Sequence, residues 1–353
     1  MGQTLKVIQV GAGSFGRSWA GIVAAAPGIA LVAIVEPFAP ARDQVRAALN
    51  GWSGPLVASL DEALGQVDAD AVLVITPPDS HHAVVTNALR AGKHVLVEKP
   101  LATTIADAAD LIATADATRR TLMVSQNYRF RRYARTIQQL IAEGRLGDLI
   151  SVRIAFQRDT RMLFGDGNFR YTMRHPLVLD MSIHHMDLLR AFTGQDVAHI
   201  DARSWRIPAS NYLHDPAAVA LIELESSISV VYEGTWASFG PETSWNGDWE
   251  FIGEDGRLTW TGGASEGAVV DLVLTRWGEE PVRLEPIELD LVDRAGSLDH
   301  FRQSIASGTE PETTARDNIR SLAAVLGIVE SIDSRQAVNV GTEFEPAPVS
   351  TQP

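Results

Sequence analysis

The segment Val7-Ile8-Gln9-Val10-Gly11-Ala12-Gly13-Ser14-Phe15-Gly16 decides the fold of the first part of this chain. A short strand, residues 7–10, leads directly into the pattern G-x-G-x-x-G, and a helical pattern follows. Each glycine has its own reason: Gly11 permits a tight turn, Gly13 lets a pyrophosphate approach the backbone, and Gly16 lets helix and strand pack closely. The helix amino terminus offers free N–H groups and the positive end of its dipole to phosphate. The segment predicts a dinucleotide site that also includes Ser14 and Phe15.

An acidic residue in the right place strengthens this prediction. Glu36 follows Gly16 by 20 residues and comes directly after the second apolar run, residues 31–35. A carboxylate at this point accepts hydrogen bonds from an adenosine ribose. It also repels a 2′-phosphate, so the sequence favours NAD as the cofactor. NADP is the less favoured alternative, because Arg42 is close enough in sequence to meet such a phosphate.

The two parts of the chain show different patterns. Continuous apolar runs alternate with helical patterns up to about residue 125, which predicts a parallel sheet covered on both faces, a doubly wound Rossmann fold. Later runs alternate in polarity and are joined by glycine-rich turns, which predicts an α/β domain with a large, open, mostly antiparallel sheet. The expected division is a dinucleotide-binding domain over 1–126, a substrate-binding and oligomerisation domain over 127–344, and a loose tail over 345–353.

Composition excludes several classes of function. The 353 residues carry 44 acidic and 30 basic side chains, a net charge of −14, which disfavours nucleic acids and anionic membranes as partners. There is no cysteine, so disulfides, cysteine nucleophiles and thiolate metal sites are excluded. No apolar run is long enough to span a membrane, and the apolar start is too short for an export signal. We expect a cytoplasmic protein.

Several later motifs make the interpretation more specific. After the glycine loop come Thr76-Pro77-Pro78, then Gly92-Lys93-His94-Val95-Leu96-Val97-Glu98-Lys99-Pro100, and later Asp180-Met181-Ser182-Ile183-His184-His185. Together they resemble the glucose–fructose oxidoreductase / inositol dehydrogenase family over nearly the whole chain. The resemblance implies hydride transfer at a sugar or polyol carbon, and a domain sheet that often makes dimer or tetramer contacts. It implies a cofactor contact at Thr76, Pro77, Glu98 and Lys99, although Glu98 could instead cap a loop.

The resemblance also implies three catalytic residues and no metal. Lys99 would lie near the nicotinamide and hydrogen-bond the reacting hydroxyl, His184 would be the general base, and Asp180 would orient His184 or contact the substrate. The chemistry suits these residue types, because an imidazole can take the hydroxyl proton and an ammonium stabilises charge that develops on the oxygen. If the stretch is helical, Asp180 and His184 share a face because they are four residues apart.

Substrate contacts are expected at Trp245, which can stack on a sugar face, at His185 and at Arg158. Arg158 belongs to a set with Arg161, Arg170 and Arg174 that either binds a substrate anion or serves as interface and surface arginines. The reaction predicted is NAD-dependent oxidation of a secondary hydroxyl of a sugar, cyclic polyol or sugar derivative. Two alternatives remain: a redox-neutral sugar-processing enzyme, such as a glycosidase, with tightly bound NAD, and a non-catalytic dinucleotide-binding regulator.

Overall fold

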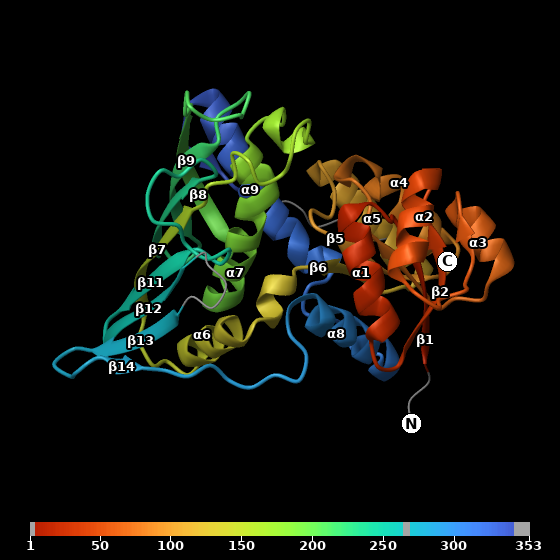
Figure 1. Cartoon of the computed structure of the whole chain (residues 1–353). Coiled ribbons are helices and arrows are strands. Elements are labelled where there is room, and N and C mark those ends of the chain that lie inside the picture. Colours follow the sequence, from red (N-terminus) through yellow and green to blue (C-terminus); the bar gives the residue numbers. More distant parts are fainter. Residues whose placement is uncertain (1–3, 264–268, 342–353) are drawn as a thin grey trace, which may run out of the picture. The chain divides into compact units, whose positions relative to one another are not determined.

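The computed structural model describes residues 4–263 and 269–341. The chain folds into two compact units (Figure 1). Unit 1 holds residues up to Phe130 together with Asp290–Ile319, and unit 2 holds Arg131–Leu289 together with the segment that starts at Arg320. The sequence pattern placed 290–319 in the second domain, whereas the structure groups this segment with the first unit. The expected tail over 345–353 lies outside the described residues.

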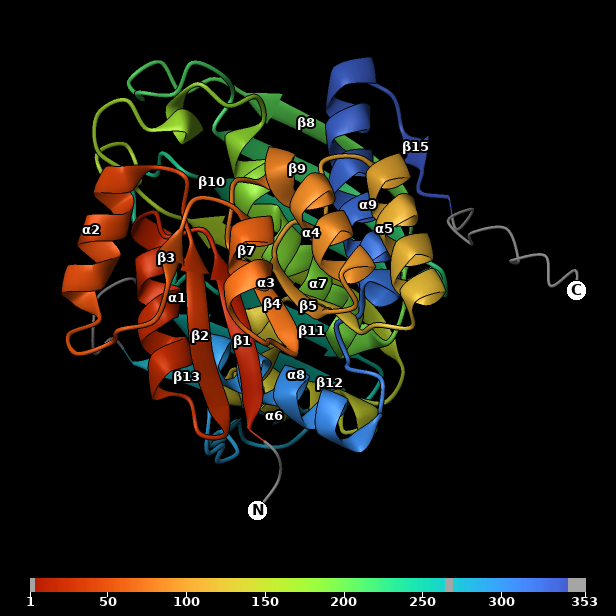
Figure 2. The same cartoon turned by 90° about the vertical axis from the view of Figure 1, so that its right-hand side faces the viewer.

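Unit 1 contains the predicted parallel sheet of six strands in the order β3-β2-β1-β4-β5-β6 (Figure 2). Every strand pair in it is parallel, and the order reverses between β1 and β4, the point at which open α/β sheets bind ligands beyond the carboxyl ends of their strands. The strands are β1 (Leu5–Val10), β2 (Ile29–Val35), β3 (Leu56–Val57), β4 (Ala71–Val74), β5 (His94–Glu98) and β6 (Leu122–Ser125). The helices are α1 (Ser14–Ala25), α2 (Ala39–Ala48), α3 (Leu60–Gln66), α4 (His81–Arg90), α5 (Ile105–Thr118) and α8 (Asp293–Ser307).

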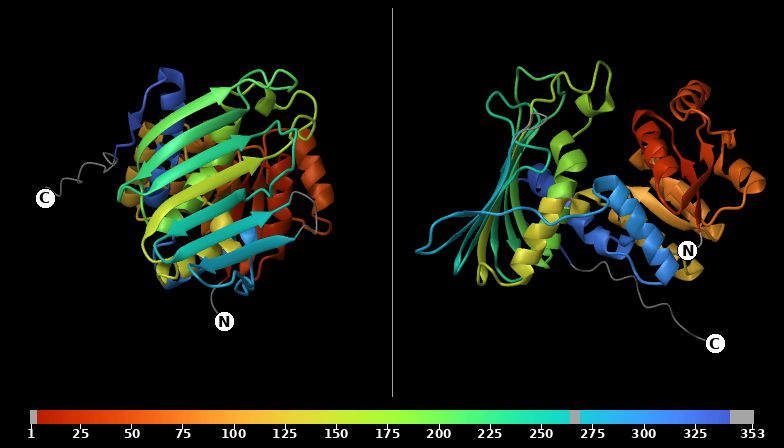
Figure 3. Two further views of the ribbon diagram at one scale, coloured as in Figure 1. Left: turned by 90° about the vertical axis from the view of Figure 1, so that its left-hand side faces the viewer. Right: turned by 60° about the horizontal axis from the view of Figure 1, so that its bottom comes forward.

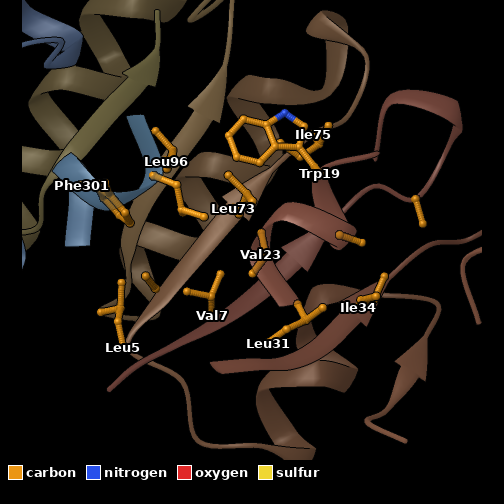
Figure 4. Close-up of a cluster of buried hydrophobic side chains, with 14 of the residues drawn as sticks. Leu5, Val7, Trp19, Val23, Leu31, Ile34, Leu73, Ile75, Leu96 and Phe301 are labelled. Carbon is orange, nitrogen blue, oxygen red and sulfur yellow. The ribbon is translucent and has the colours of Figure 1, made fainter. Parts of the chain in front are cut away.

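A hydrophobic cluster between the sheet, α1 and α8 fixes the position of the glycine loop (Figure 4). Trp19 and Val23 of α1 are fully buried against Leu73 of β4 and Leu96 of β5. Phe301 reaches the same cluster from α8, which explains why a segment near residue 300 belongs to unit 1. Since apolar burial is the main driving force of folding, this cluster holds α1 and the strand ends in one rigid arrangement.

Unit 2 contains a sheet of nine strands in the order β14-β13-β12-β11-β7-β10-β9-β8-β15 (Figure 3). All of its pairs are antiparallel except β10 with β7, so the predicted mostly antiparallel sheet is confirmed. The strands are β7 (Leu149–Gln157), β8 (Val197–Trp205), β9 (Ala217–Leu224), β10 (Ser229–Thr235), β11 (Asp248–Gly253), β12 (Gly256–Gly262), β13 (Val270–Arg276), β14 (Val282–Arg283) and β15 (Val338–Asn339).

The two faces of this sheet differ. Helices α6 (Arg132–Ala142) and α7 (Ile183–Thr193) lie on one side of it, and α9 (Ala315–Ser334), which begins in unit 1, continues there. Over the described residues no helix lies on the other face (Figure 3). The burial of β10 follows this arrangement, since Val230 and Tyr232 are buried whereas Val231 and Glu233 are exposed.

Candidate functional site

The glycine loop of unit 1 has the geometry that a dinucleotide needs. Gly11 has φ +100°, and a Cβ placed on it would lie 2.2 Å from the carbonyl oxygen of Ile75. A Cβ on Gly16 would lie 2.4 Å from the carbonyl oxygen of Gly11. Only glycine fits either position. A Cβ on Gly13, by contrast, would meet nothing within 4 Å, so the backbone there faces open space that a pyrophosphate can approach.

The start of α1 lies in this open space. Gly13 is the N-cap residue of α1, and it has no side chain to accept a hydrogen bond from the first turn. The first amide groups of a helix have no acceptor within the helix, and they carry a partial positive charge. The N-terminus of α1 therefore suits the two phosphates of NAD.

Glu36 is joined directly to the glycine loop. Its Oε2 accepts a hydrogen bond of 2.8 Å from the Ala12 N–H, and its Oε1 accepts one of 3.0 Å from the Phe38 N–H. Each carboxylate oxygen keeps a second lone pair for a ribose hydroxyl. Arg42 donates to the carbonyl oxygens of Glu36 and Pro37, at 2.6 and 3.0 Å. A positive charge thus lies beside the acidic residue, so both cofactors remain compatible with the geometry.

Thr76 and Pro77 follow β4, the strand next to the glycine loop. The Thr76 hydroxyl is buried and has no hydrogen-bond partner within the described ranges 4–263 and 269–341. Such an atom loses free energy unless a ligand or water satisfies it, so it is a natural point for a cofactor contact. Pro77 accepts hydrogen bonds from the amide and the hydroxyl of Ser80, which shapes the turn into α4.

Lys99 follows β5 directly and is held through its backbone. Its N–H donates to Glu98 Oε2 at 3.1 Å, and the other oxygen of Glu98 accepts from the Trp19 indole N–H at 2.8 Å. Glu98 is buried, and burial raises the pKa of its carboxyl, although Lys99, Trp19 and Arg294 act in the opposite direction. Glu98 thus ties the strand end to α1, which supports the capping role that the sequence left open. No local signal points to Trp19 in this role, because the two residues are 79 positions apart.

Arg294 of α8 contacts the glycine loop and the first turns of α1. Its guanidinium lies 5.0 Å from the ring centre of Phe15 and 5.5 Å from that of Trp19, and it donates to the Ser18 hydroxyl at 2.9 Å. Phe15 is half exposed, so its ring lies at the surface of the loop. The predicted cofactor residue Phe15 therefore stacks on an arginine that the sequence did not single out.

In unit 2 the predicted catalytic pair lies on one continuous helical segment. Asp180 belongs to the π-helical turn η4 (Val178–Ser182), and His184 lies in the first turn of α7, which follows without a break. Single π-helical turns occur often at functional sites. Asp180 is partly buried, and its Oδ2 accepts a hydrogen bond of 2.6 Å from Arg170 Nε. His184 is 7% exposed.

His185, an expected substrate contact, lies in a different environment from His184. Its ring has no exposed surface and packs against Phe156, Tyr232 and Trp249, with centroid distances of 5.0, 5.7 and 6.4 Å. Burial lowers the pKa of His185 to about 3, so the ring is neutral. His185 thus lies in the aromatic core of unit 2, and its role as a substrate contact stays a prediction.

The structure brings Arg158 and Trp245 together. The guanidinium of Arg158 lies 4.7 Å from the ring centre of Trp245, and its NH1 donates to the Thr243 carbonyl oxygen at 3.2 Å. Arg158 is also paired with Glu242 at 3.3 Å. The Trp245 ring is partly exposed, so it can offer a face to a ligand.

Two classes of site find no support in the described ranges. Within residues 4–263 and 269–341, no group of three His, Asp or Glu side chains is arranged to hold a metal ion. Among the helices of the same ranges, none is long and apolar enough to cross a membrane.

Comparisons with known proteins find matches for both parts of the chain. A family profile described as "Oxidoreductase family, NAD-binding Rossmann fold" matches residues 5–126, and the profile of the GFO/IDH/MocA C-terminal domain matches residues 134–259. A 1,5-anhydro-D-fructose reductase of Ensifer adhaerens is 27% identical over 94% of this chain and 98% of its own length. An inositol 2-dehydrogenase of Rhizobium meliloti is 24% identical over 96% and 99%.

Solved structures show the same fold. The crystal structure of an oxidoreductase from Agrobacterium radiobacter, in complex with NAD+, L-tartaric acid and magnesium, matches with a TM-score of 0.85. The match covers 96% of this chain and 99% of the other, at 21% identity, and it therefore supports the fold alone.

Proposed function

Because the chain belongs to the GFO/IDH/MocA oxidoreductase family, with its NAD-binding Rossmann fold, we propose that it is a dehydrogenase of a sugar, cyclic polyol or sugar derivative. It oxidises a secondary hydroxyl, and NAD is the preferred cofactor. The observation that carries the proposal is the joint geometry of the glycine loop and Glu36, in which open backbone at Gly13 adjoins a carboxylate anchored to the Ala12 N–H. A reductase acting on the corresponding ketone would use the same residues in reverse.

Three side chains divide the chemistry between them. Bound NAD supplies the hydride acceptor. Lys99 donates a hydrogen bond to the reacting oxygen and stabilises the negative charge that develops there. His184 takes the hydroxyl proton as general base, and Asp180 holds the imidazole of His184 in the productive orientation.

Arg170 contributes to this arrangement by holding Asp180. Its charge-assisted bond of 2.6 Å to Oδ2 fixes the direction of the carboxylate, which has four lone-pair positions and can accept several bonds at once. Trp245 and Arg158 supply a flat face and a polar edge, which suits the C–H face and the hydroxyls of a sugar ring.

The test is a turnover assay with NAD and, separately, NADP, against inositols, aldoses, anhydrosugars, glycosides and sugar acids. The expected result is formation of NADH with one ring type and a preference for NAD. Lys99→Met and His184→Ala should each lower kcat at least about 100-fold while NAD still binds. Normal turnover in both variants would refute the assignment.

We also propose that the chain forms a homodimer or homotetramer through the uncovered sheet face of unit 2. Leu221 and Val231 are cross-strand partners there, and their side chains are 59% and 38% exposed. On the neighbouring strands β7 and β11, Arg153 forms an ion pair with Glu250. The face therefore carries charges as well as apolar surface. Light scattering of Leu221→Asp should show a smaller assembly than the parent protein, and an unchanged mass would refute the use of this face.

A further inference from the structure

His81 is a buried titratable side chain with no role in the chemistry above. It begins α4 and has no exposed surface. Its Nδ1 lies 2.8 Å from the carbonyl oxygen of Pro100, and its Nε2 lies 2.9 Å from that of Thr76. One ring therefore connects the loop after β4 with the loop after β5, the two loops that carry the expected cofactor residues Thr76 and Lys99.

Both partners of the His81 ring are hydrogen-bond acceptors. A carbonyl oxygen only accepts hydrogen bonds, and a neutral imidazole carries one N–H, so the neutral ring donates to one of the two carbonyl oxygens according to its tautomer. Burial lowers the pKa of His81, and the charge of Lys99 acts in the same direction, whereas the carbonyl groups of Pro100, Thr76 and Leu101 raise it. With its pKa lowered, the ring is neutral and lies between two acceptors, the carbonyl oxygens of Pro100 and Thr76, of which one receives its N–H.

His82, the next residue, provides a natural comparison. It is partly exposed, and its Nε2 is 2.8 Å from a carboxylate oxygen of Asp110 on α5. The two histidines share a residue type and a helix turn, but the ring of His81 contacts the strand-end loops and the ring of His82 contacts a neighbouring helix. A difference between their variants therefore reports on the loop contacts and not on the helix start in general.

The backbone of Lys99 is held on both sides. On its amino side, the Lys99 N–H donates to Glu98, which Trp19 fixes from α1. On its carboxyl side, the carbonyl group of Pro100 is fixed by His81 from α4. Two separate helices thus determine where the lysine side chain starts.

We propose that His81 is a positioning residue for Lys99: its buried ring lies between the loop after β4 and the loop after β5, and its N–H is donated to one of the two carbonyl oxygens, that of Pro100 or that of Thr76. The role of Lys99 in turnover rests on the proposed function, but the contacts of His81 do not. A displacement of about 1 Å at a reacting group can cost about 100-fold in rate. Loss of the contacts between His81 and the two loops should therefore lower kcat more than it weakens NAD binding.

The first experiment compares three variants. His81→Phe keeps an aromatic ring but has no N–H group, His81→Gln can donate to one of the two carbonyl groups, and His82→Gln is the matched control. We expect kcat to fall about 10- to 100-fold in His81→Phe and less in His81→Gln, and to stay unchanged in His82→Gln. The Kd for NAD should change less than about threefold in all three. Parental kcat in His81→Phe, or a Kd that worsens as much as kcat falls, would overturn the proposal.

The second experiment needs no turnover and therefore separates this proposal from the proposed function. The chain has only three lysines, Lys6, Lys93 and Lys99. Reductive methylation with 13C-formaldehyde gives three lysine signals in a carbon NMR spectrum, beside that of the amino terminus. Lys6 pairs with Asp68 and Lys93 donates to the Ala69 carbonyl oxygen, so both serve as internal references.

The Lys99 signal should shift in His81→Phe, while the Lys6 and Lys93 signals stay in place. His82→Gln should move none of the three. An unmoved Lys99 signal in His81→Phe would overturn the positioning role, even if a substrate is found. A shifted signal in a protein that oxidises no sugar would support the role and count against the proposed function alone.

Discussion

Replacement of Trp19 by phenylalanine tests how the lysine loop is anchored. The indole of Trp19 is fully buried, and its N–H donates to the buried carboxyl of Glu98 at 2.8 Å. Phenylalanine keeps most of the apolar contact with the cluster in Figure 4 but removes the donor. Glu98 Oε1 is then left in the interior without this bond, and the other oxygen still accepts from the Lys99 N–H.

The expected cost has two parts. A hydrogen bond to a charged group contributes about 1.5–3 kcal/mol, and an unsatisfied buried acceptor pays a desolvation cost of the same order. The missing ring atoms leave a small cavity that costs roughly 1–2 kcal/mol more. Trp19→Phe should therefore lower the free energy of unfolding by about 2.5–5 kcal/mol. Trp52 is the matched control, because it is only partly buried and donates to a neutral acceptor, the Leu31 carbonyl oxygen, at 3.0 Å; Trp52→Phe should cost about 1–2 kcal/mol.

Urea unfolding followed by far-ultraviolet circular dichroism measures both variants. The pKa of Glu98 is raised by burial, so its ionised form opposes folding and the protonated form at low pH does not. The cost of Trp19→Phe should accordingly be larger at neutral pH than near pH 4.5, the ordinary value for this group. A cost no greater than that of Trp52→Phe at neutral pH would show that the Glu98 bond does not anchor the loop.

Three further predictions follow from single positions. Gly13→Ala should change the free energy of unfolding by less than about 1 kcal/mol, because its Cβ meets nothing, yet weaken NAD binding at least about tenfold in calorimetry. Glu36→Ser should lower the ratio of NAD to NADP affinity at least about tenfold in fluorescence titration, and an unchanged ratio would remove Glu36 from cofactor choice. In the parent protein the folded-state pKa of His185 is lowered, so stability is lost as the pH falls from about 6.5 to 3, by up to roughly 5 kcal/mol at the acid end of this window. His185→Phe should remove this loss and flatten the dependence of stability on pH over the same window. A slope equal to that of the parent protein would contradict the buried, neutral ring.

Local pattern was enough for the nucleotide half of the fold. The expected runs over 7–10 and 31–35 coincide with β1 and β2 to within a few residues. These strands are central and buried on both faces, so their sequences are continuously apolar and stand out. The glycine pattern was equally local, because all three glycines lie within six residues of one another.

Elements whose pattern is mixed were missed. The side chains of β8 (Val197–Trp205) point alternately to the core and to the uncovered face. The polar residues between the apolar ones make the strand hard to recognise in the sequence. The helix α8 buries Leu298 and Phe301 but also Ser297 and Ser304, so it has no clear apolar stripe. Helix α8 packs against elements of unit 1 that are far from it in sequence, and no local pattern predicts this packing.

The pairing of charged side chains could not be predicted from the sequence either, and the four arginines show what this means for the substrate. The sequence left open whether they bind an anion, and the structure gives every one of them a carboxylate: Arg158 with Glu242, Arg161 with Asp159, Arg170 with Asp180 and Arg174 with Asp333. A substrate carboxylate would have to displace a resident one or accept a second-best geometry, whereas a neutral hydroxyl can bind to an arginine–carboxylate pair as donor and acceptor at once. The pairing of Arg170 with Asp180 matters most, because Arg170 neutralises the charge of Asp180, the residue expected to orient the base. We therefore expect neutral sugars or polyols to be oxidised in preference to sugar acids.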